Sequence, residues 1–422
     1  MFQGLVSGLA AALIATCASA TGANAANDVD GQVNELERKI DVLTEEVRNL
    51  KEQQTVPEKK EYKSMYGLGP AASKVYGVEQ GLSIGAYGEF NLKETVDDSA
   101  GNDDVFDFVR LVMYLGYKFN DWIVFNSEIE FEHASTGKDG EVSVEFATLD
   151  FLFDPRVNVR AGLLLVPVGF LNELHEPPFY LGNVRPQVEQ QIIPSTWRAN
   201  GAGFFGEIGP LAYRTYVVSS LDASGFASGN IRGGRQNGSQ EIAENFSWVG
   251  RLDYTPIPGL LVGGSAYLGN SGQDNDYAGE GADVFTQLYE LHAEFKRRGL
   301  ELRALATLLE LDDADVLSVA LEQTIAEEML GWYAEIAYDV LPLILPGTSH
   351  YLAPWFRYSS IDTQHDVPSG FAEDETKDRK IYEVGLTYKP IPRVVIKLDY
   401  RNQEAEEGTV ADEVRVGAGF IF

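Results

Sequence analysis

The segment from Leu171 to Ala199 concentrates side chains that could bind ions or polar solutes. It combines carboxylates, an imidazole and guanidinium groups with apolar residues and several prolines, which suits a rigid loop folded into a lumen. Its candidate residues are Glu173, His175, Glu176, Arg185, Glu189 and Arg198. Charged groups of both signs around a narrow passage would select solutes by charge and size. The alternative is that single members brace the segment through ion pairs.

Catalysis is not expected from these residues. A hydrolase would need an activated nucleophile or paired acids with a base in reach. The 5 histidines fall in separate parts of the chain, without a companion motif: His133, His175, His292, His350 and His365. His175 lies between Glu173 and Glu176, but that spacing alone does not predict a metal ligand. We therefore predict that the chain is not an enzyme and has no catalytic residues, cofactor site or metal site.

The charge balance excludes one class of partner. The chain has 64 acidic and 33 basic residues, a net charge of -31, whereas nucleic-acid binding needs a basic surface. The chain contains 1 cysteine, Cys17, which lies in the segment that we expect to be removed on export. Disulfide scaffolds, thiol catalysis and cysteine-ligated metals are therefore not expected.

The first residues indicate export. Residues 2–26 carry no charged side chain, and the apolar run Leu9–Ala15 is followed by the small-residue pattern Ala23-Asn24-Ala25. This is typical of a signal peptide cleaved near Ala25, so 1–25 is the predicted leader and the predicted location is beyond the inner membrane of a Gram-negative bacterium.

A heptad pattern follows the predicted leader. Apolar residues alternate in steps of four and three at Val29, Val33, Leu36, Ile40, Leu43, Val47 and Leu50. The pattern predicts a short α-helical coiled coil at 28–55 in the periplasm, and the alternative is a single amphipathic helix lying on the protein's own surface. We expect a polar linker at 56–80, after which the apolar period changes to two.

From residue 81 onward the chain alternates between apolar and polar residues in short runs. We place strands at 82–93, 105–119, 122–133, 141–153, 156–165, 200–208, 211–220, 244–255, 260–269, 284–296, 299–309, 328–339, 349–359, 379–389, 393–402 and 411–422. Short connections such as Asn120-Asp121 and Gly209-Pro210 alternate with long polar ones, as expected when the two ends of a barrel face different compartments. We predict an all-β protein, a 16-stranded antiparallel transmembrane β-barrel over 81–422. Pro354 is expected only at a bulge or a poorly paired position.

Several motifs in this region resemble one family of barrels. They are Val157–Gly162 followed by Pro167-Val168-Gly169, Tyr254–Pro258, its counterpart Tyr388–Pro392, and Val395–Tyr400. In this order they resemble the phosphate-selective porin superfamily and its relatives over roughly residues 80–422. The resemblance implies a 16-stranded, often trimeric diffusion channel that the third loop, here about 171–199, constricts from inside. It does not fix the solute, because this chain lacks the lysine-rich cluster and arginine series expected for phosphate selection.

Strand parity predicts which charged residues line the inner wall. These are Arg110, Glu128, Glu130, Arg160, Arg214, Arg251, Arg303, Glu335, Arg357, Lys397 and Arg401. Facing arcs of opposite charge would hold water and favour small polar solutes, whereas local pairing within the wall would serve structure alone. Both alternatives are open at this point.

The long connections are rich in carboxylates, for example at Asp97-Asp98, Asp312-Asp313 and Glu373–Glu375. They could share divalent cations with lipopolysaccharide phosphates. We predict an outer-membrane porin, a water-filled channel for passive diffusion of small hydrophilic solutes or ions. Its expected partners are outer-membrane lipid, lipopolysaccharide and copies of itself, as a trimer. The alternative is a structural anchor that tethers the membrane through its periplasmic coiled coil.

Overall fold

The computed structural model describes residues 38–40, 42, 63–96, 104–138, 140–277 and 279–422. The chain divides into two compact units, Met1–Glu61 and Tyr62–Phe422. In the first unit only Arg38–Ile40 and Val42 are described, and they are helical. The predicted leader and almost all of the predicted coiled coil therefore lie outside the described residues. No helix among the described residues is long and apolar enough to cross a bilayer.

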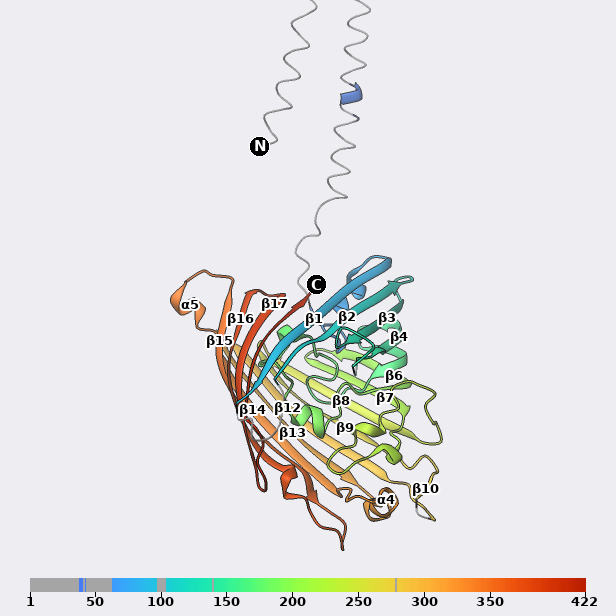
Figure 1. The fold of residues 1–422 in the computed structure, drawn as a ribbon. Helices are drawn as coiled ribbons and strands as arrows, with labels where there is room; N and C mark the ends of the chain where they lie inside the picture. The colour runs from blue at the N-terminus through green and yellow to red at the C-terminus, as the bar shows by residue number, and fades with distance from the viewer. Residues whose placement is uncertain (1–37, 41, 43–62, 97–103, 139, 278) are drawn as a thin grey trace, which may run out of the picture. The chain divides into compact units, whose positions relative to one another are not determined.

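The unit Tyr62–Phe422 contains a closed barrel of sixteen antiparallel strands (Figure 1). The barrel strands are β1 (Gly81–Thr95), β2 (Val105–Lys118), β3 (Ile123–Glu132), β4 (Val142–Asp154), β5 (Val157–Leu165), β6 (Arg198–Ile208), β7 (Leu211–Ser219), β8 (Phe246–Ile257), β9 (Leu260–Asn270), β12 (Phe285–Arg297), β13 (Leu300–Leu311), β14 (Glu328–Tyr338), β15 (Tyr351–Asp366), β16 (Asp378–Ile391), β17 (Val394–Ala405) and β18 (Glu413–Ile421). Each predicted strand overlaps one of these, so the predicted sixteen-stranded antiparallel barrel is confirmed.

The first and last strands close the ring. β1 pairs with β2 on one side and with β18 on the other, with Tyr87 opposite Ile421 and Thr95 opposite Glu413. The last residue extends this pairing, because Phe422 and Ala86 exchange backbone hydrogen bonds of 2.8 and 2.9 Å. Closure leaves no strand edge unpaired along this seam.

The two faces of the wall differ in the way that the residue alternation predicts. On β14, Leu330, Trp332 and Ile336 are 38%, 43% and 47% exposed, whereas Tyr333 and Glu335 between them are buried on the inner face. This is the reverse of a soluble barrel, in which the apolar side chains would fill the interior. An apolar outside and a polar inside are typical of barrels that lie in lipid.

Strand β15 is longer than predicted, and its proline lies where one side of the strand is not paired. It extends to Asp366, beyond the predicted end at 359, and its pairing with β16 runs through Pro354 without a register shift. There is no bulge at this proline, so of the two expected settings the poorly paired position is the one found. The pairing of β15 with β14 ends at Trp355. Proline has no backbone N–H, and at position 354 that pairing does not need one.

The described part of the predicted linker at 56–80 packs inside the barrel. The 3₁₀ helix η1 (Ala72–Gly77) contacts β1, β2 and β3, and its Val75 is 1% exposed. Leu68, Ala71 and Tyr76 join the same apolar cluster, which also includes inner-face residues of β1 to β4. From Met65 onward the segment is therefore folded onto the wall, because its apolar residues find a buried surface there.

The connections carry the remaining elements. β10 (Asp276–Tyr277) and β11 (Glu280–Gly281) form a separate hairpin between β9 and β12. The helical turns are η3 (Pro177–Phe179), α3 (Val188–Gln191), η4 (Ala223–Gly225), η5 (Arg232–Gly234), α4 (Ala314–Leu321), α5 (Leu341–Ile344) and η6 (Glu375–Lys377). Of these, η3 and α3 belong to the connection between β5 and β6, which holds most of the candidate site residues.

Candidate functional site

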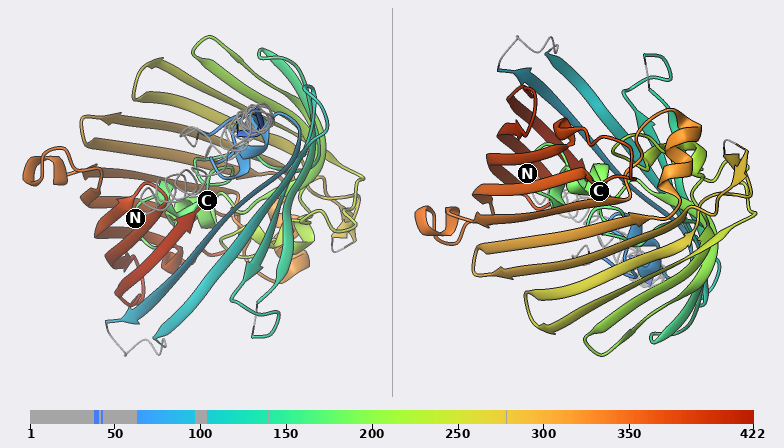
Figure 2. Two further views of the ribbon diagram at one scale, coloured as in Figure 1. Left: turned by 90° about the horizontal axis from the view of Figure 1, so that it is seen from above. Right: turned by 90° about the horizontal axis from the view of Figure 1, so that it is seen from below.

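The connection 166–197, which we call the inner loop, crosses the interior of the barrel. It leaves β5 and returns to β6, yet its η3 contacts β1, β17 and β18, and its α3 contacts β14 and β15. Viewed along the barrel in Figure 2, the green ribbon of this segment lies within the ring of strands. The inner loop therefore reaches the wall opposite the strands that carry it.

One asparagine fastens the two ends of the inner loop together. Asn172 donates from Nδ2 to the carbonyl oxygens of Val166 (2.6 Å) and Trp197 (2.8 Å), and its Oδ1 accepts from the Trp197 N–H at 2.6 Å. Asn172 and Trp197 are both buried. Because all three bonds are made inside the protein, the loop has a fixed conformation at its base.

All six predicted constriction residues are buried: Glu173, His175, Glu176, Arg185, Glu189 and Arg198. Five lie in the inner loop, and Arg198 is the first residue of β6. His175 and Arg198 both contact Glu145, and the other four make separate contacts. Their role in solute passage stays a prediction.

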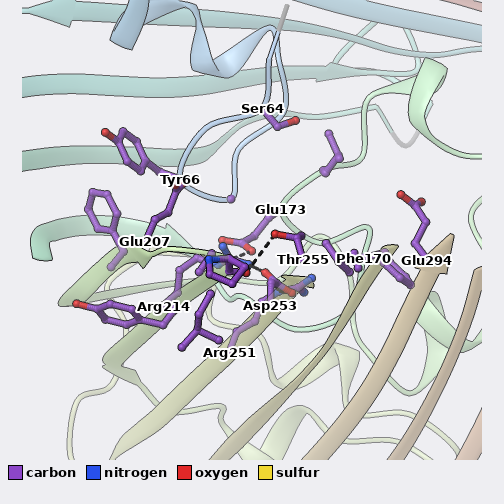
Figure 3. A pocket seen from close by; sticks show the side chains of 18 of the residues that line it. Ser64, Tyr66, Phe170, Glu173, Glu207, Arg214, Arg251, Asp253, Thr255 and Glu294 are labelled. Carbon is purple, nitrogen blue, oxygen red and sulfur yellow. Dashed lines mark hydrogen bonds and ion pairs between the residues drawn. The ribbon is translucent and has the colours of Figure 1, made fainter. Parts of the chain in front are cut away.

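Glu173 belongs to a charged network on β7 to β12. Its carboxylate lies 3.0 Å from the Arg214 guanidinium, which also contacts Asp253 at 2.6 Å. Asp253 further contacts Arg251 at 2.9 Å and His292 at 2.8 Å. Burial raises the pKa of Glu173, and Arg214 opposes that rise. Figure 3 shows Glu173, Arg214, Arg251 and Asp253 converging at the wall of a cavity.

A second network lies on β14 to β17, one strand beyond the first in the ring. Arg357 contacts Glu335 at 2.8 Å and Glu383 at 2.9 Å, and it donates to the Leu181 carbonyl of the inner loop at 3.0 Å. Glu383 also contacts Arg401 at 2.8 Å. The inner wall and the inner loop are thus joined by buried, charge-assisted hydrogen bonds.

Most of the remaining predicted wall residues are paired in the same local manner, and Lys397 contacts an aromatic ring instead. Arg160 contacts Asp150 at 2.8 Å, Arg110 contacts Glu89 at 2.8 Å and Arg303 contacts Glu294 at 2.5 Å. Glu130 accepts a hydrogen bond from Arg110 at 3.2 Å, and the Lys397 ammonium lies 3.6 Å from the centre of the Tyr180 ring. Local pairing therefore accounts for most of the described wall residues, and an effect of facing arcs of charge on solutes stays a prediction.

The inner loop also meets the segment that precedes β1. The carboxylate of Glu176 accepts a hydrogen bond of 3.0 Å from the Ala71 N–H. Burial raises the pKa of Glu176 to about 8, against the opposing effect of the Ala71 N–H. This contact joins two segments 105 residues apart in the sequence.

His175 faces two carboxylates that sequence spacing did not suggest. Its Nε2 lies 3.1 Å from Glu128 of β3 and 3.1 Å from Glu145 of β4, not beside Glu173 or Glu176. Burial lowers the pKa of His175, but Glu128 and Glu145 raise it to about 10. The imidazole therefore carries a proton at neutral pH when no other cation occupies its place.

Two cavities lie on either side of the inner loop. The turn-side cavity, of about 480 Å³, is lined by inner-loop residues such as Glu173 and Leu174 and by residues near the short turns such as Pro210 and Thr255 (Figure 3). The loop-side cavity, of about 290 Å³, is lined by Gln190, Gln191, Ser228, Gly229, Asn230, Arg232, Thr363, Lys377 and Arg379. Both cavities have polar and charged linings.

Sequence reasoning missed two arginines that hold the inner loop. Arg235 donates from Nη1 to the carbonyl oxygens of Pro194 (3.2 Å) and Thr196 (2.8 Å), and Arg232 donates to the Ser195 carbonyl. Burial and the neighbouring Arg232 together lower the pKa of Arg235 to about 9. Both residues belong to a glycine-rich connection without periodicity, so no pattern in the sequence placed them.

Comparisons with known proteins agree with this architecture. No family model matches the chain. An uncharacterized protein of Aquifex aeolicus (strain VF5) is 34% identical over 390 residues, which cover 89% of this chain and 87% of that protein. The two chains belong to one family.

Solved structures show which fold this family has. Salmonella typhi OmpF in complex with daunomycin aligns with a TM-score of 0.54 and 13% identity, over 82% of this chain and 98% of that one. An anion-selective porin from Comamonas acidovorans gives 0.52 and 12%, over 82% and 100%. In-vitro folded OmpT of Vibrio cholerae, in its trimer form, gives 0.51 and 13%, over 81% and 99%. The family thus has a porin-type barrel, and its phosphate-selective assignment stays a prediction.

Glu189 offers a test of how the inner loop of this porin-type barrel is held. Its carboxylate accepts hydrogen bonds from the Tyr333 hydroxyl at 2.6 Å and the Leu171 N–H at 2.7 Å. Glu189→Ala leaves both buried donors without an acceptor, so the free energy of unfolding should fall by about 2–4 kcal/mol. Urea unfolding in detergent micelles, followed by tryptophan fluorescence, measures this change.

Glu189→Gln is the matched control for that substitution. Its amide keeps one acceptor oxygen, so its free energy of unfolding should lie between those of the wild type and Glu189→Ala. Equal midpoints for all three proteins would show that Glu189 does not hold the loop.

Proposed function

We propose that this protein is an outer-membrane porin of a Gram-negative bacterium, a multi-pass barrel through which small hydrophilic solutes or ions diffuse passively. The observation that carries the proposal is the inverted wall, with apolar side chains outside and charged side chains inside, combined with polar cavities on both sides of the inner loop. An apolar exterior matches the hydrocarbon core of a membrane, and a charged interior matches water and polar solutes.

The inner loop supplies the constriction of the proposed channel. It divides the lumen between the turn-side and loop-side cavities, and it is held by Asn172, Glu189 and Arg357. A loop fixed by buried hydrogen bonds would keep a constant opening, which favours selection by size over gating. Glu173 and Arg214 line the turn-side cavity and are the groups that a solute would meet there.

A structural anchor remains the second candidate, because much of the lumen is filled by ion pairs. An anchor has no need for charged cavities, however, and the turn-side cavity measures about 480 Å³ with carboxylates and cations among its lining residues. This feature favours the channel.

The trimer and the contacts with lipopolysaccharide, including those through divalent cations, also remain proposals, and chemical cross-linking of the folded protein in outer-membrane vesicles would test both.

Conductance across a planar lipid bilayer is the direct test. Refolded full-length protein should give stepwise, ohmic current increases in potassium chloride, because ions can enter the charged lumen. Circular dichroism of the same sample must show β structure, and detergent without protein is the control. Folded protein that inserts into the bilayer and gives no current steps would contradict the channel and favour the anchor.

A further inference from the structure

We propose that Glu128, Glu145 and His175 bind one divalent transition-metal ion, with zinc as the best match, between the inner loop and the wall. The three residues come from β3, β4 and the inner loop, and all are 1% exposed or less. The site would fasten the inner loop to the barrel wall. The inference concerns ion binding alone and does not depend on whether the barrel conducts.

The ligand atoms are spaced for a shared ion. His175 Nε2 lies 3.1 Å from Glu128 Oε1 and 3.1 Å from Glu145 Oε2, and all three ligand atoms lie within 4.8 Å of one another. A tetrahedral zinc ion with ligands at about 2.1 Å places neighbouring ligand atoms about 3.4 Å apart. Small rotations of the two glutamates therefore suffice to coordinate one ion. One imidazole nitrogen and two carboxylates are ligands that zinc accepts.

The imidazole is oriented for this role. His175 Nδ1 lies 3.1 Å from the Asn172 carbonyl oxygen, to which it can donate its hydrogen. That bond leaves the Nε2 lone pair directed at the two carboxylates, the arrangement that metal-binding histidines generally have. Asn172 is itself held by three hydrogen bonds at the base of the loop, so the ring has little freedom to turn away.

Glu145 is the most deeply buried of the three proposed ligands. It is fully buried, and among the described residues neither of its carboxylate oxygens accepts a hydrogen bond of ordinary geometry. Its charged neighbours are His175 and Arg198, whose Nη1 is 3.7 Å away. A buried carboxylate needs positive charge beside it, and a coordinated ion would supply that charge in place of the proton on His175.

A local irregularity in the sheet directs Glu145 inward. The pairing of β3 with β4 shifts between Glu128 and Ile129, so that Phe146 and Val144 find partners and Glu145 between them does not. Glu145 and Phe146 are consequently both buried on the inner side. Bulges of this kind re-aim a side chain and often occur next to functional sites.

His292 is a natural comparison within the same lumen. Its Nδ1 lies 2.7 Å from Glu290 and its Nε2 lies 2.8 Å from Asp253, but the Arg251 guanidinium is also 3.1 Å from Nε2. A cation thus already occupies the space beside this histidine. The contacts of His175 include no such guanidinium on Nε2 within hydrogen-bond distance among the described residues.

The test is metal content. Refolded full-length protein is dialysed with a chelator, loaded with Zn²⁺ or Co²⁺, and measured by mass spectrometry of the metal and by visible absorption of bound Co²⁺. We expect one ion per chain, with at least a tenfold lower affinity in His175→Gln and in Glu145→Gln. His292→Gln, which changes the other buried histidine, should bind as the wild type does.

Either of two results would overturn the proposal. One is folded wild-type protein that retains no stoichiometric Zn²⁺ or Co²⁺, which would leave His175 as an imidazolium between two carboxylates. The other is unchanged affinity in the site variants. Should His175→Gln fail to fold, Glu145→Gln and the Co²⁺ spectrum of the wild type decide the question, because that spectrum reports a nitrogen and oxygen ligand set directly.

Discussion

Arg357→Met should lower the free energy of unfolding by about 3–5 kcal/mol, because it removes the cation that two buried carboxylates share. Arg357 is fully buried and contacts Glu335 at 2.8 Å and Glu383 at 2.9 Å. Methionine has a similar length but cannot neutralise either group. It also leaves the Leu181 carbonyl of the inner loop without its 3.0 Å donor.

Urea unfolding of the refolded barrel in detergent measures this loss. The control is Arg156→Met, which removes an arginine from the exposed Arg156 and Asp154 pair and should leave the midpoint unchanged. The triple variant Arg357→Met, Glu335→Gln, Glu383→Gln should recover part of the stability, since the buried charges are then absent. Arg357→Met with a wild-type midpoint would show that the pair is hydrated in solution.

The barrel itself could be predicted because its inner and outer faces have opposite chemistry. In β14 the change from Trp332 to Tyr333 and from Glu335 to Ile336 follows the period of two, and a one-residue slip would expose Glu335 to the apolar side. Short turns with proline or glycine then set the strand limits. The extension of β15 was missed because polar residues such as Thr363 and Gln364 occur on both faces near the long connection.

The contents of the lumen could not be predicted in the same way. Strand parity gave the inward direction of Arg160 and Arg214, but their partners depend on register and on how the inner loop folds. Glu145 reaches the His175 ring through an irregularity between β3 and β4, which leaves no mark in the residue pattern. The segment around η1 is polar and glycine-rich in sequence. Its few apolar residues form no periodic pattern, and their burial depends on contact with the barrel wall.

The long connections and the loop-side cavity favour ions of opposite charge. The long connections are rich in carboxylates, which would attract cations to the mouth. The loop-side cavity is lined instead by Arg232, Lys377 and Arg379, with no carboxylate among its described lining residues. Screening weakens charges on exposed loops more than charges at a narrow cavity, so the cavity should decide which ion passes.

The variant Arg232→Gln, Lys377→Gln, Arg379→Gln should therefore lower the ratio of anion to cation permeability by about tenfold. Each charge acts on an ion at about 8 Å with roughly 0.5 kcal/mol at the dielectric constant of water, and screening at physiological salt reduces this to about 0.2 kcal/mol. Three charges therefore shift the anion and the cation by about 0.6 kcal/mol in opposite directions, which changes their ratio by about 1.2 kcal/mol. The reversal potential in a potassium chloride gradient measures the ratio, and the effect should shrink at high salt.

Lys380→Gln provides the matched control for this last prediction. Lys380 follows Arg379 on β16 but is exposed, and its ammonium lies 3.9 Å from Glu406. The substitution Lys380→Gln removes one positive charge from the same strand without changing the cavity, so the reversal potential should stay at the wild-type value. If the triple variant also keeps that value while the channel conducts, ions pass the inner loop by another route and the acidic connections set the preference. If both variants shift it equally, the net charge of the protein controls selectivity, and the cavity has no special part in it.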